Sequence, residues 1–270
     1  MKITENPAGI RPRVALNPIQ WIATADGWID PTLAPEPRNL LAEVAETGFR
    51  AIHAQVPAGW RVSDYARVLA ETGLEPAPGY LALGLPEHGM SRAEAVEAAR
   101  IAAALHAGLG LQDMFISTRM LRDVPRVLHP AIGAAFDEAR FAAIISLMDE
   151  VSVAIRAEGI YPALHPHVGT WIETETETRR VLDALPASQI GFGPDTGHLS
   201  WAGADIAALL ADYRDRVRVM HVKDCLLSRC REAVAANRSY RDTVVGGIWA
   251  EPGHGELGLD AMIAGTGARL

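Results

Sequence analysis

The sequence predicts an α/β protein with a (β/α)8-type TIM barrel fold that lacks a normal eighth strand. An alanine-rich helical stretch that ends in glycine and leads directly into a β-rich run occurs four times, with the glycines at Gly48, Gly73, Gly108 and Gly159. Glycine at such a position allows the left-handed conformation that ends many helices. The runs that follow are apolar on both faces, which is typical of buried parallel strands. Helices and strands that alternate in this way predict a parallel sheet.

Seven strands are expected in order along the chain, near 13–19, 50–56, 76–83, 112–117, 160–165, 189–193 and 216–222. Because no GxGxxG motif follows the first strand, a dinucleotide-binding doubly wound sheet is disfavoured and a barrel fits better. The segment 173–180, ETETETRR, is expected to form the first turns of an exposed helix, since acidic residues favour a helix N-terminus. No eighth strand is recognisable in 258–270. The strand edge of an open barrel predicts self-association as a homodimer, or a covering of that edge.

The whole chain, 1–270, is expected to be one domain, because no linker rich in serine or proline interrupts it. A net charge of −8 disfavours nucleic acid as a partner, since such a surface repels phosphate. The two cysteines, Cys225 and Cys230, provide no disulfide framework and suit a reducing compartment. Residues 1–14 contain no apolar leader, and no apolar run is long enough for a membrane. The expected location is the cytoplasm, with no membrane partner.

Three consecutive expected strands end in histidine or aspartate, at the motifs HPH, PDTGH and HVKD. The active site of a barrel lies at the C-terminal ends of its strands, so these ends should meet. Alternate residues of a strand face the same side, which allows His165 and His167 both to point into the barrel mouth. Imidazole and carboxylate ligands together suit Zn, Mn, Fe or Co. The pattern therefore predicts a metal site.

Each of these residues also has an ordinary structural explanation. Asp195 can cap a helix or form an Asx-turn, and His198 can be a packed histidine bonded to backbone. Lys223 and Asp224 can form an exposed ion pair of little energetic value. Trp171 can be a core aromatic or part of a lid. The coincidence of three strand ends is what favours the metal site.

The segments HPHVGTWIET, PDTGHLSWAG, VMHVKD and EPGHGELGLD together resemble the xylose isomerase-like TIM-barrel family, from the first strand to about Asp260. Its members include sugar isomerases, epimerases, inosose dehydratases and type IV AP endonucleases. The resemblance implies one divalent metal, Mn or Zn before Mg, Co or Fe. The implied ligands are His165, Asp195 and His221. Substrate-binding positions are expected at His53, His198, Trp171 and Glu251.

The resemblance implies an isomerase, epimerase or dehydratase that acts on a sugar or polyol through an enediolate-type intermediate. His167 or Lys223 would be the catalytic base. Epimerases of the family carry glutamate where this chain has His165, which favours dehydration here. Since the usual strand 8 ligand is not recognisable, a non-catalytic sugar-binding barrel is one alternative. An AP endonuclease is the other, and the acidic charge argues against it.

Overall fold

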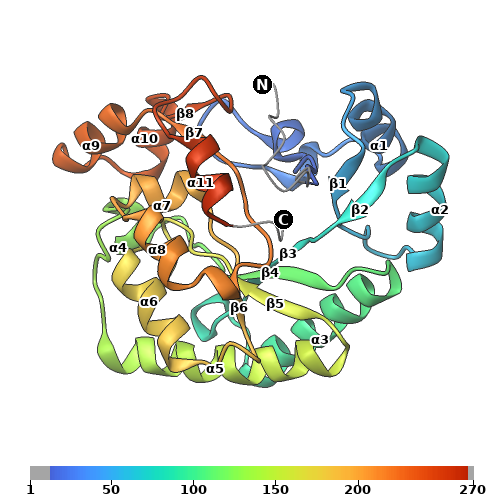
Figure 1. The fold of residues 1–270 in the computed structure, drawn as a ribbon, viewed down its shortest axis with the longest axis horizontal. Helices are drawn as coiled ribbons and strands as arrows, with labels where there is room; N and C mark the ends of the chain where they lie inside the picture. The colour runs from blue at the N-terminus through green and yellow to red at the C-terminus, as the bar shows by residue number, and fades with distance from the viewer. Residues whose placement is uncertain (1–12, 267–270) are drawn as a thin grey trace.

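The structure, a computed structural model, describes residues 13–266. Parallel strands at the centre of the molecule are surrounded by helices (Figure 1). Two parallel sheets follow one another along the chain. The first pairs β1 (Ala51–His53) with β2 (Glu75–Ala77). The second consists, in order, of β3 (Tyr80–Leu83), β4 (Asp113–Thr118), β5 (Tyr161–Leu164) and β6 (Gly191–Phe192). The predicted parallel α/β architecture is confirmed. The expectation that no leader is present concerns residues 1–14, most of which lie outside the described residues.

Two predicted strands are not regular strands. From 13–19 only Leu16 bridges to the sheet, at Ile52, because Pro18 has no N–H to donate and a 3-10 helix begins at Ile19. From 216–222 only Val217 and His221 form parallel bridges. The chain nevertheless runs where these strands would lie. The predicted strand 76–83 is divided into β2 and β3, which pair with different neighbours.

The helices lie outside the strands, and Figure 1 shows α3 and α5 side by side along one flank. α3 presents Ala95, Ala99 and Ala103 to the core, and these small side chains allow the two helices to approach closely. The helices are α1 (Pro37–Glu46), α2 (Val62–Thr72), α3 (Arg92–Gly108), α4 (Pro125–Leu128), α5 (Glu138–Ala157), α6 (Glu175–Ala184), α7 (Thr196–Trp201), α8 (Ile206–Asp212), α9 (Leu227–Ala235), α10 (Tyr240–Val245), α11 (Leu259–Gly265), and the 3-10 helices η1 (Ile19–Ile22), η2 (Pro31–Leu33), η3 (Pro86–His88) and η4 (Arg214–Arg216).

Three of the four predicted left-handed glycines are confirmed, with φ of +89° at Gly48, +70° at Gly73 and +81° at Gly159. The prediction for Gly108 is wrong, since this residue ends α3 and Gly110 takes the positive φ. A Cβ on Gly108 would lie 3.0 Å from Val62 Cγ1. Gly108 is therefore needed for the close approach of α2 rather than for a turn.

The acidic segment forms the start of α6 as predicted, but it is not exposed. Glu173 and Glu177 are buried together with Arg126, whose Nη2 donates to Glu177 Oε1 at 2.6 Å. Glu173 accepts hydrogen bonds from the backbone N–H groups of residues 131, 133 and 169. Burial raises the pKa of Glu173 to about 7, against the effect of these donors and of Arg126. The two carboxylates thus anchor the loop that follows β5.

The last strands differ from a regular barrel, as the sequence predicted. β7 (Asp224–Cys225) pairs antiparallel with β8 (Trp249–Ala250), and within residues 13–266 no eighth parallel strand joins the segment 216–222 to the segment around Leu16. Cys225 and Cys230 are both buried and free in the structure. Among residues 13–266, none of the helices combines the length and hydropathy that a membrane-spanning helix needs. Self-association stays a prediction.

Candidate metal centre

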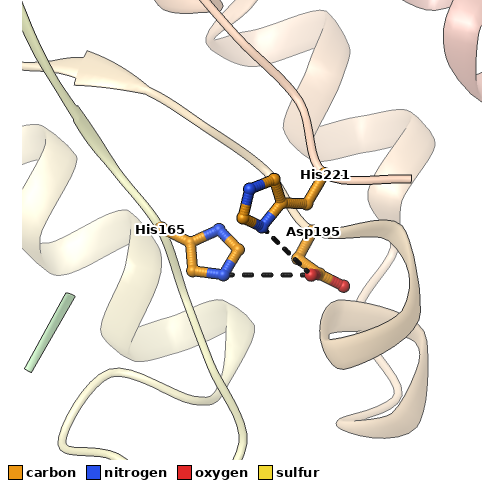
Figure 2. A group of neighbouring side chains, drawn as sticks. All are labelled: His165, Asp195 and His221. Carbon is orange, nitrogen blue, oxygen red and sulfur yellow. Dashed lines mark ion pairs between the residues drawn. The ribbon is translucent and has the colours of Figure 1, made fainter. Parts of the chain in front are cut away.

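The three predicted ligands His165, Asp195 and His221 lie together at the C-terminal ends of neighbouring strand segments (Figure 2). One ligand atom from each lies within 4.8 Å of the others. His165 Nε2 and His221 Nδ1 are each 3.8 Å from Asp195 Oδ2. This distance is too long for a hydrogen bond, but ligand atoms about 2.1 Å from one tetrahedral ion lie roughly 3.4 Å apart. The donor set and its spacing fit a divalent metal.

The backbone of the strand ends positions each ligand. His165 follows β5 and its N–H donates to the carbonyl of Ile116 at 2.8 Å. Asp195 caps α7, because its Oδ1 accepts from the N–H of His198 at 2.9 Å. The helix-cap interpretation of Asp195 is therefore correct for Oδ1, while Oδ2 faces the two histidines. A parallel bridge between Asp195 and His221 holds the third ligand beside the second.

The protonation states of the group suit metal binding. His165 Nδ1 lies 3.2 Å from the carbonyl oxygen of Gly193, which can only accept, so Nδ1 carries the proton and Nε2 keeps its lone pair. Burial lowers the pKa of His165 to about 4. Burial raises the pKa of Asp195, but Lys223, His165 and His221 outweigh it and bring the pKa to about 2. A neutral imidazole and a carboxylate are the forms that bind metals.

Two further predicted histidines lie beside the ligands. The ring centroid of His167 is 6.0 Å from that of His165 and 3.6 Å from that of His198. His167 Nδ1 donates to the carbonyl of Val168 at 2.8 Å, so Nε2 keeps a lone pair. Burial, with Lys223 and His165, lowers the pKa of His167 to about 3. His167 is thus a neutral ring close to the predicted ligands.

His53 is a further histidine of the cluster and lies beside the predicted ligand His221. It is the last residue of β1, where its N–H donates to the carbonyl of Leu16 at 2.9 Å, and its ring centroid is 5.9 Å from that of His221. Burial lowers the pKa of His53 to about 4, and its Nε2 has no hydrogen-bond partner among the described residues. His53 is therefore a half-buried, neutral residue whose Nε2 atom is buried and uncommitted.

Lys223 and Asp224 do not form the exposed ion pair that was one interpretation of HVKD. Lys223 Nζ lies 2.8 Å from Asp195 Oδ2, the oxygen that both ligand histidines face. Asp224 is buried and points to a different part of the chain. Its carboxylate accepts hydrogen bonds from the N–H groups of Gly253, Gly255 and Leu257. Lys223, just before β7, and Asp224, the first residue of β7, therefore serve different parts of the molecule.

Comparison with known proteins identifies the fold. A sequence profile described as the xylose isomerase-like TIM barrel matches residues 41–264, most of the chain. The chain belongs to the xylose isomerase-like TIM barrel family. Solved structures with the same fold include the IolI protein with a bound zinc atom, at TM-score 0.64 and 14% identity over 96% of this chain and 86% of that chain. D-allulose 3-epimerase from Methylomonas sp. has TM-score 0.63 and 17% identity, over 95% and 80% of the two chains.

Curated relatives match a shorter part of the chain. Inosose dehydratase of Mesomycoplasma hyopneumoniae (strain 7448) is 33% identical over 102 residues, which is 38% of this chain and 34% of the relative. Inosose dehydratase of Salmonella agona (strain SL483) is 23% identical over 129 residues, 48% of this chain and 43% of the relative. The chain thus aligns with about a third to less than half of the length of these relatives.

Two residues predicted to bind substrate have other surroundings in this family member. Trp171 donates from Nε1 to Glu87 at 3.0 Å and packs against the guanidinium groups of Arg126 and Arg140. It lines a pocket of about 330 Å³ that contains none of the three predicted ligands. Glu251 is exposed just after β8 and does not belong to the predicted metal group. Substrate binding by both residues stays a prediction.

Four aromatic residues of the site were not predicted. Tyr80 and Phe115 place their ring centroids 5.4 Å from that of His165. Trp249 lies 5.2 Å from His198 by the same measure, and Tyr240 lies 6.4 Å from His167. Phe115 could have been found from the alternation of its strand. Trp249 and Tyr240 lie after the last predicted strand. No local sequence pattern predicts that this segment folds back over the barrel mouth.

Proposed function

We propose that this family member is a metal-dependent dehydratase that removes water from a ketone-bearing sugar or polyol. The observation that supports this best is the contact between His167 and His198, whose ring centroids are 3.6 Å apart beside the predicted ligands. The similarity of part of the chain to curated inosose dehydratases makes inosose the first substrate to test. Isomerisation and epimerisation share the first step with this reaction.

His165, Asp195 and His221 would hold the cation. When bound, a divalent cation supplies a Lewis acid that polarises a ketone and acidifies the adjacent C–H bond. Zn or Mn is the expected ion, because both accept imidazole and carboxylate ligands. The IolI structure with the same fold contains zinc, which is consistent with this choice.

His167 would take the proton from carbon. Its Nδ1 proton is held by the carbonyl of Val168, so the lone pair of Nε2 is available. Its ring lies 6.0 Å from that of His165, within reach of a substrate bound at the predicted ligands. A positioned imidazole of this kind contributes about 10²–10⁴-fold to proton transfer.

Lys223 would give a proton to the leaving hydroxyl group. Its ammonium group is beside Asp195 and its side chain is one-quarter exposed, so it reaches both the predicted metal position and the opening. The C–H and C–O bonds break, a C=C bond forms next to the ketone, and water leaves. His167 then returns its proton to Lys223 through solvent, which restores both groups.

The arrangement of bases favours dehydration over epimerisation. Epimerisation through a planar intermediate needs proton carriers on both faces of the substrate. His167 and His198 are in contact with each other and therefore serve the same face. The position that epimerases of the family use for glutamate is His165, which here is a predicted ligand. One face with a base and a nearby acid suits elimination of water.

The experiment follows solvent exchange and product together. Protein loaded with Zn or Mn is incubated with inosose in D₂O, and proton NMR follows loss of the α-proton and formation of an alkene product. The proposal predicts both signals, and His167→Asn should slow their appearance by about 10²–10⁴-fold. Exchange without alkene would mean isomerisation or epimerisation. If the metal-loaded protein catalyses neither step with inosose or with a panel of ketoses, the proposal is wrong.

A further inference from the structure

We propose that the ammonium group of Lys223 and the metal ion compete for Asp195 Oδ2, so that metal binding releases Lys223 toward the substrate. The inference rests on the metal site of the proposed function and concerns how that site is assembled. Lys223 Nζ is 2.8 Å from this oxygen, closer than either ligand histidine at 3.8 Å. Lys223 thus holds the carboxylate oxygen that the ion must use.

The other oxygen of Asp195 is already engaged in a hydrogen bond. Its Oδ1 accepts the N–H of His198 at 2.9 Å and thereby caps α7. An ion about 2.1 Å from Oδ2 and an ammonium group on the same oxygen would be at most about 5 Å apart. Two positive charges so close in a buried site repel strongly, because little water screens them. Binding of the ion therefore weakens the pair between Lys223 and Asp195.

The backbone and stem of Lys223 are fixed, so only its outer part can move. Its N–H donates to Thr196 Oγ1 at 2.9 Å, and that hydroxyl donates back to the carbonyl of Lys223 at 2.6 Å. A Cβ on Gly197 would lie 2.7 Å from Lys223 Cβ and 2.7 Å from Trp249 Cζ3. The stem of Lys223 and the Trp249 ring thus both pack against the backbone of α7. Displacement must take the form of a rotation of the terminal carbons.

The Trp249 ring offers the released ammonium group a place. Its centroid is 5.6 Å from Lys223 Nζ, within cation–π distance, and the ring also contacts His198. Because this contact already exists while Lys223 is paired with Asp195, the ammonium group can keep it when the terminal carbons rotate away from the carboxylate. The same displacement that admits the ion would then free a proton donor for the substrate.

The amino-acid composition of the chain supports a specific need for lysine at position 223. Lysine occurs twice, as Lys2 and Lys223, beside 23 arginines. Arginine has a broad planar head that binds a carboxylate with two hydrogen bonds, whereas the lysine head is a compact point charge. A compact head can leave a single oxygen by rotation, and a guanidinium group held by two bonds cannot do so as readily. The scarcity of lysine also makes Lys223 simple to monitor.

The test measures Zn affinity by competition with a chromophoric chelator at one fixed pH. Lys223→Met removes the competing charge and should bind Zn at least ten-fold more tightly than the wild type. Lys223→Arg, the charged control, should not bind more tightly. If wild type binds Zn and Lys223→Met binds equally or more weakly, the inference is wrong while the metal site of the proposed function stands.

Two other outcomes separate the inference from the proposed function. If only Lys223→Met binds Zn, competition is supported, and the metal-dependent activity of the wild type is not. If neither protein binds Zn, both proposals fail. A second measurement needs no variant: acetylation of Lys223 relative to Lys2, read by mass spectrometry, should rise several-fold in saturating Zn. A ratio that is unchanged or lower would overturn the inference.

Discussion

The carboxylate of Asp224 accepts a hydrogen bond from the backbone N–H of Gly253 at 2.8 Å. The same carboxylate binds two more N–H groups of the loop, at Gly255 and Leu257. It thereby fixes the segment that follows β8 against β7, directly beside Lys223. One buried carboxylate thus holds the loop after β8 in its place at the barrel mouth.

Asp224→Asn should destabilise the protein by about 2–3 kcal/mol, because the amide group turns a donor toward N–H groups that need an acceptor. Urea denaturation at pH 7.5 measures this. Glu251→Gln, at an exposed position of the same loop, is the control and should change stability by less than about 0.5 kcal/mol. Equal stability of Asp224→Asn and wild type would refute the role of the carboxylate.

Gly255→Ala should destabilise the same loop. A Cβ at this position would overlap Asp224 Oδ1 and contact the backbone N of Cys225 at 2.9 Å. We expect a loss of about 1–3 kcal/mol, typical of overpacking. Gly258→Ala is the matched control, since a Cβ there meets nothing within 4 Å and its φ of −78° suits alanine. Thermal unfolding of Gly255→Ala and Gly258→Ala tests this prediction, and similar melting temperatures of the two variants would refute it.

The low pKa of His53 predicts that the folded protein loses stability in acid. Burial lowers its pKa to about 4, whereas an unfolded histidine has a pKa near 6.5. Since the unfolded chain binds more protons between these values, this stability is fully present above about pH 6.5 and is lost as the pH falls toward 4. The difference in unfolding free energy between pH 7.5 and pH 5.5 should be about 1 kcal/mol smaller for His53→Gln than for the wild type. The exposed control His254→Gln should retain the wild-type difference.

The sequence predicted the parts of this molecule that depend on local patterns. The strand ends around His165, Asp195 and His221 were found because parallel strands bring their C-terminal ends together, whatever the details of each strand. The regular strands expected at 13–19 and 216–222 were wrong. Pro18 interrupts the first, and the second pairs at isolated residues only.

Long-range contacts explain what the sequence missed. Glu173 and Glu177 belong to an acidic run that suggests solvent, and their burial depends on Arg126, about fifty residues earlier. Trp249 reaches His198 only because the chain after β7 folds back, and the anchor of that fold is Asp224. Neither contact leaves a periodic signal, since the partners are joined by tertiary packing and not by spacing.

His167→Asn should lower turnover by about 10²–10⁴-fold and leave Zn affinity within a few-fold of the wild type. The reason is that His167 Nε2 is the proposed base but is not one of the three predicted ligands. The measurement is kcat with inosose together with Zn affinity. A variant that loses Zn and activity together would assign His167 to the metal instead.

The proposed function requires that His165, Asp195 and His221 together hold one divalent metal. The most direct test is the metal content of desalted protein after incubation with Zn or Mn, measured by elemental analysis. We expect about one equivalent per chain for the wild type and for His165→Glu, which keeps a ligand. His165→Ala should retain less than about a tenth of an equivalent. If the wild-type protein holds no more metal than His165→Ala, these three residues do not form a metal site.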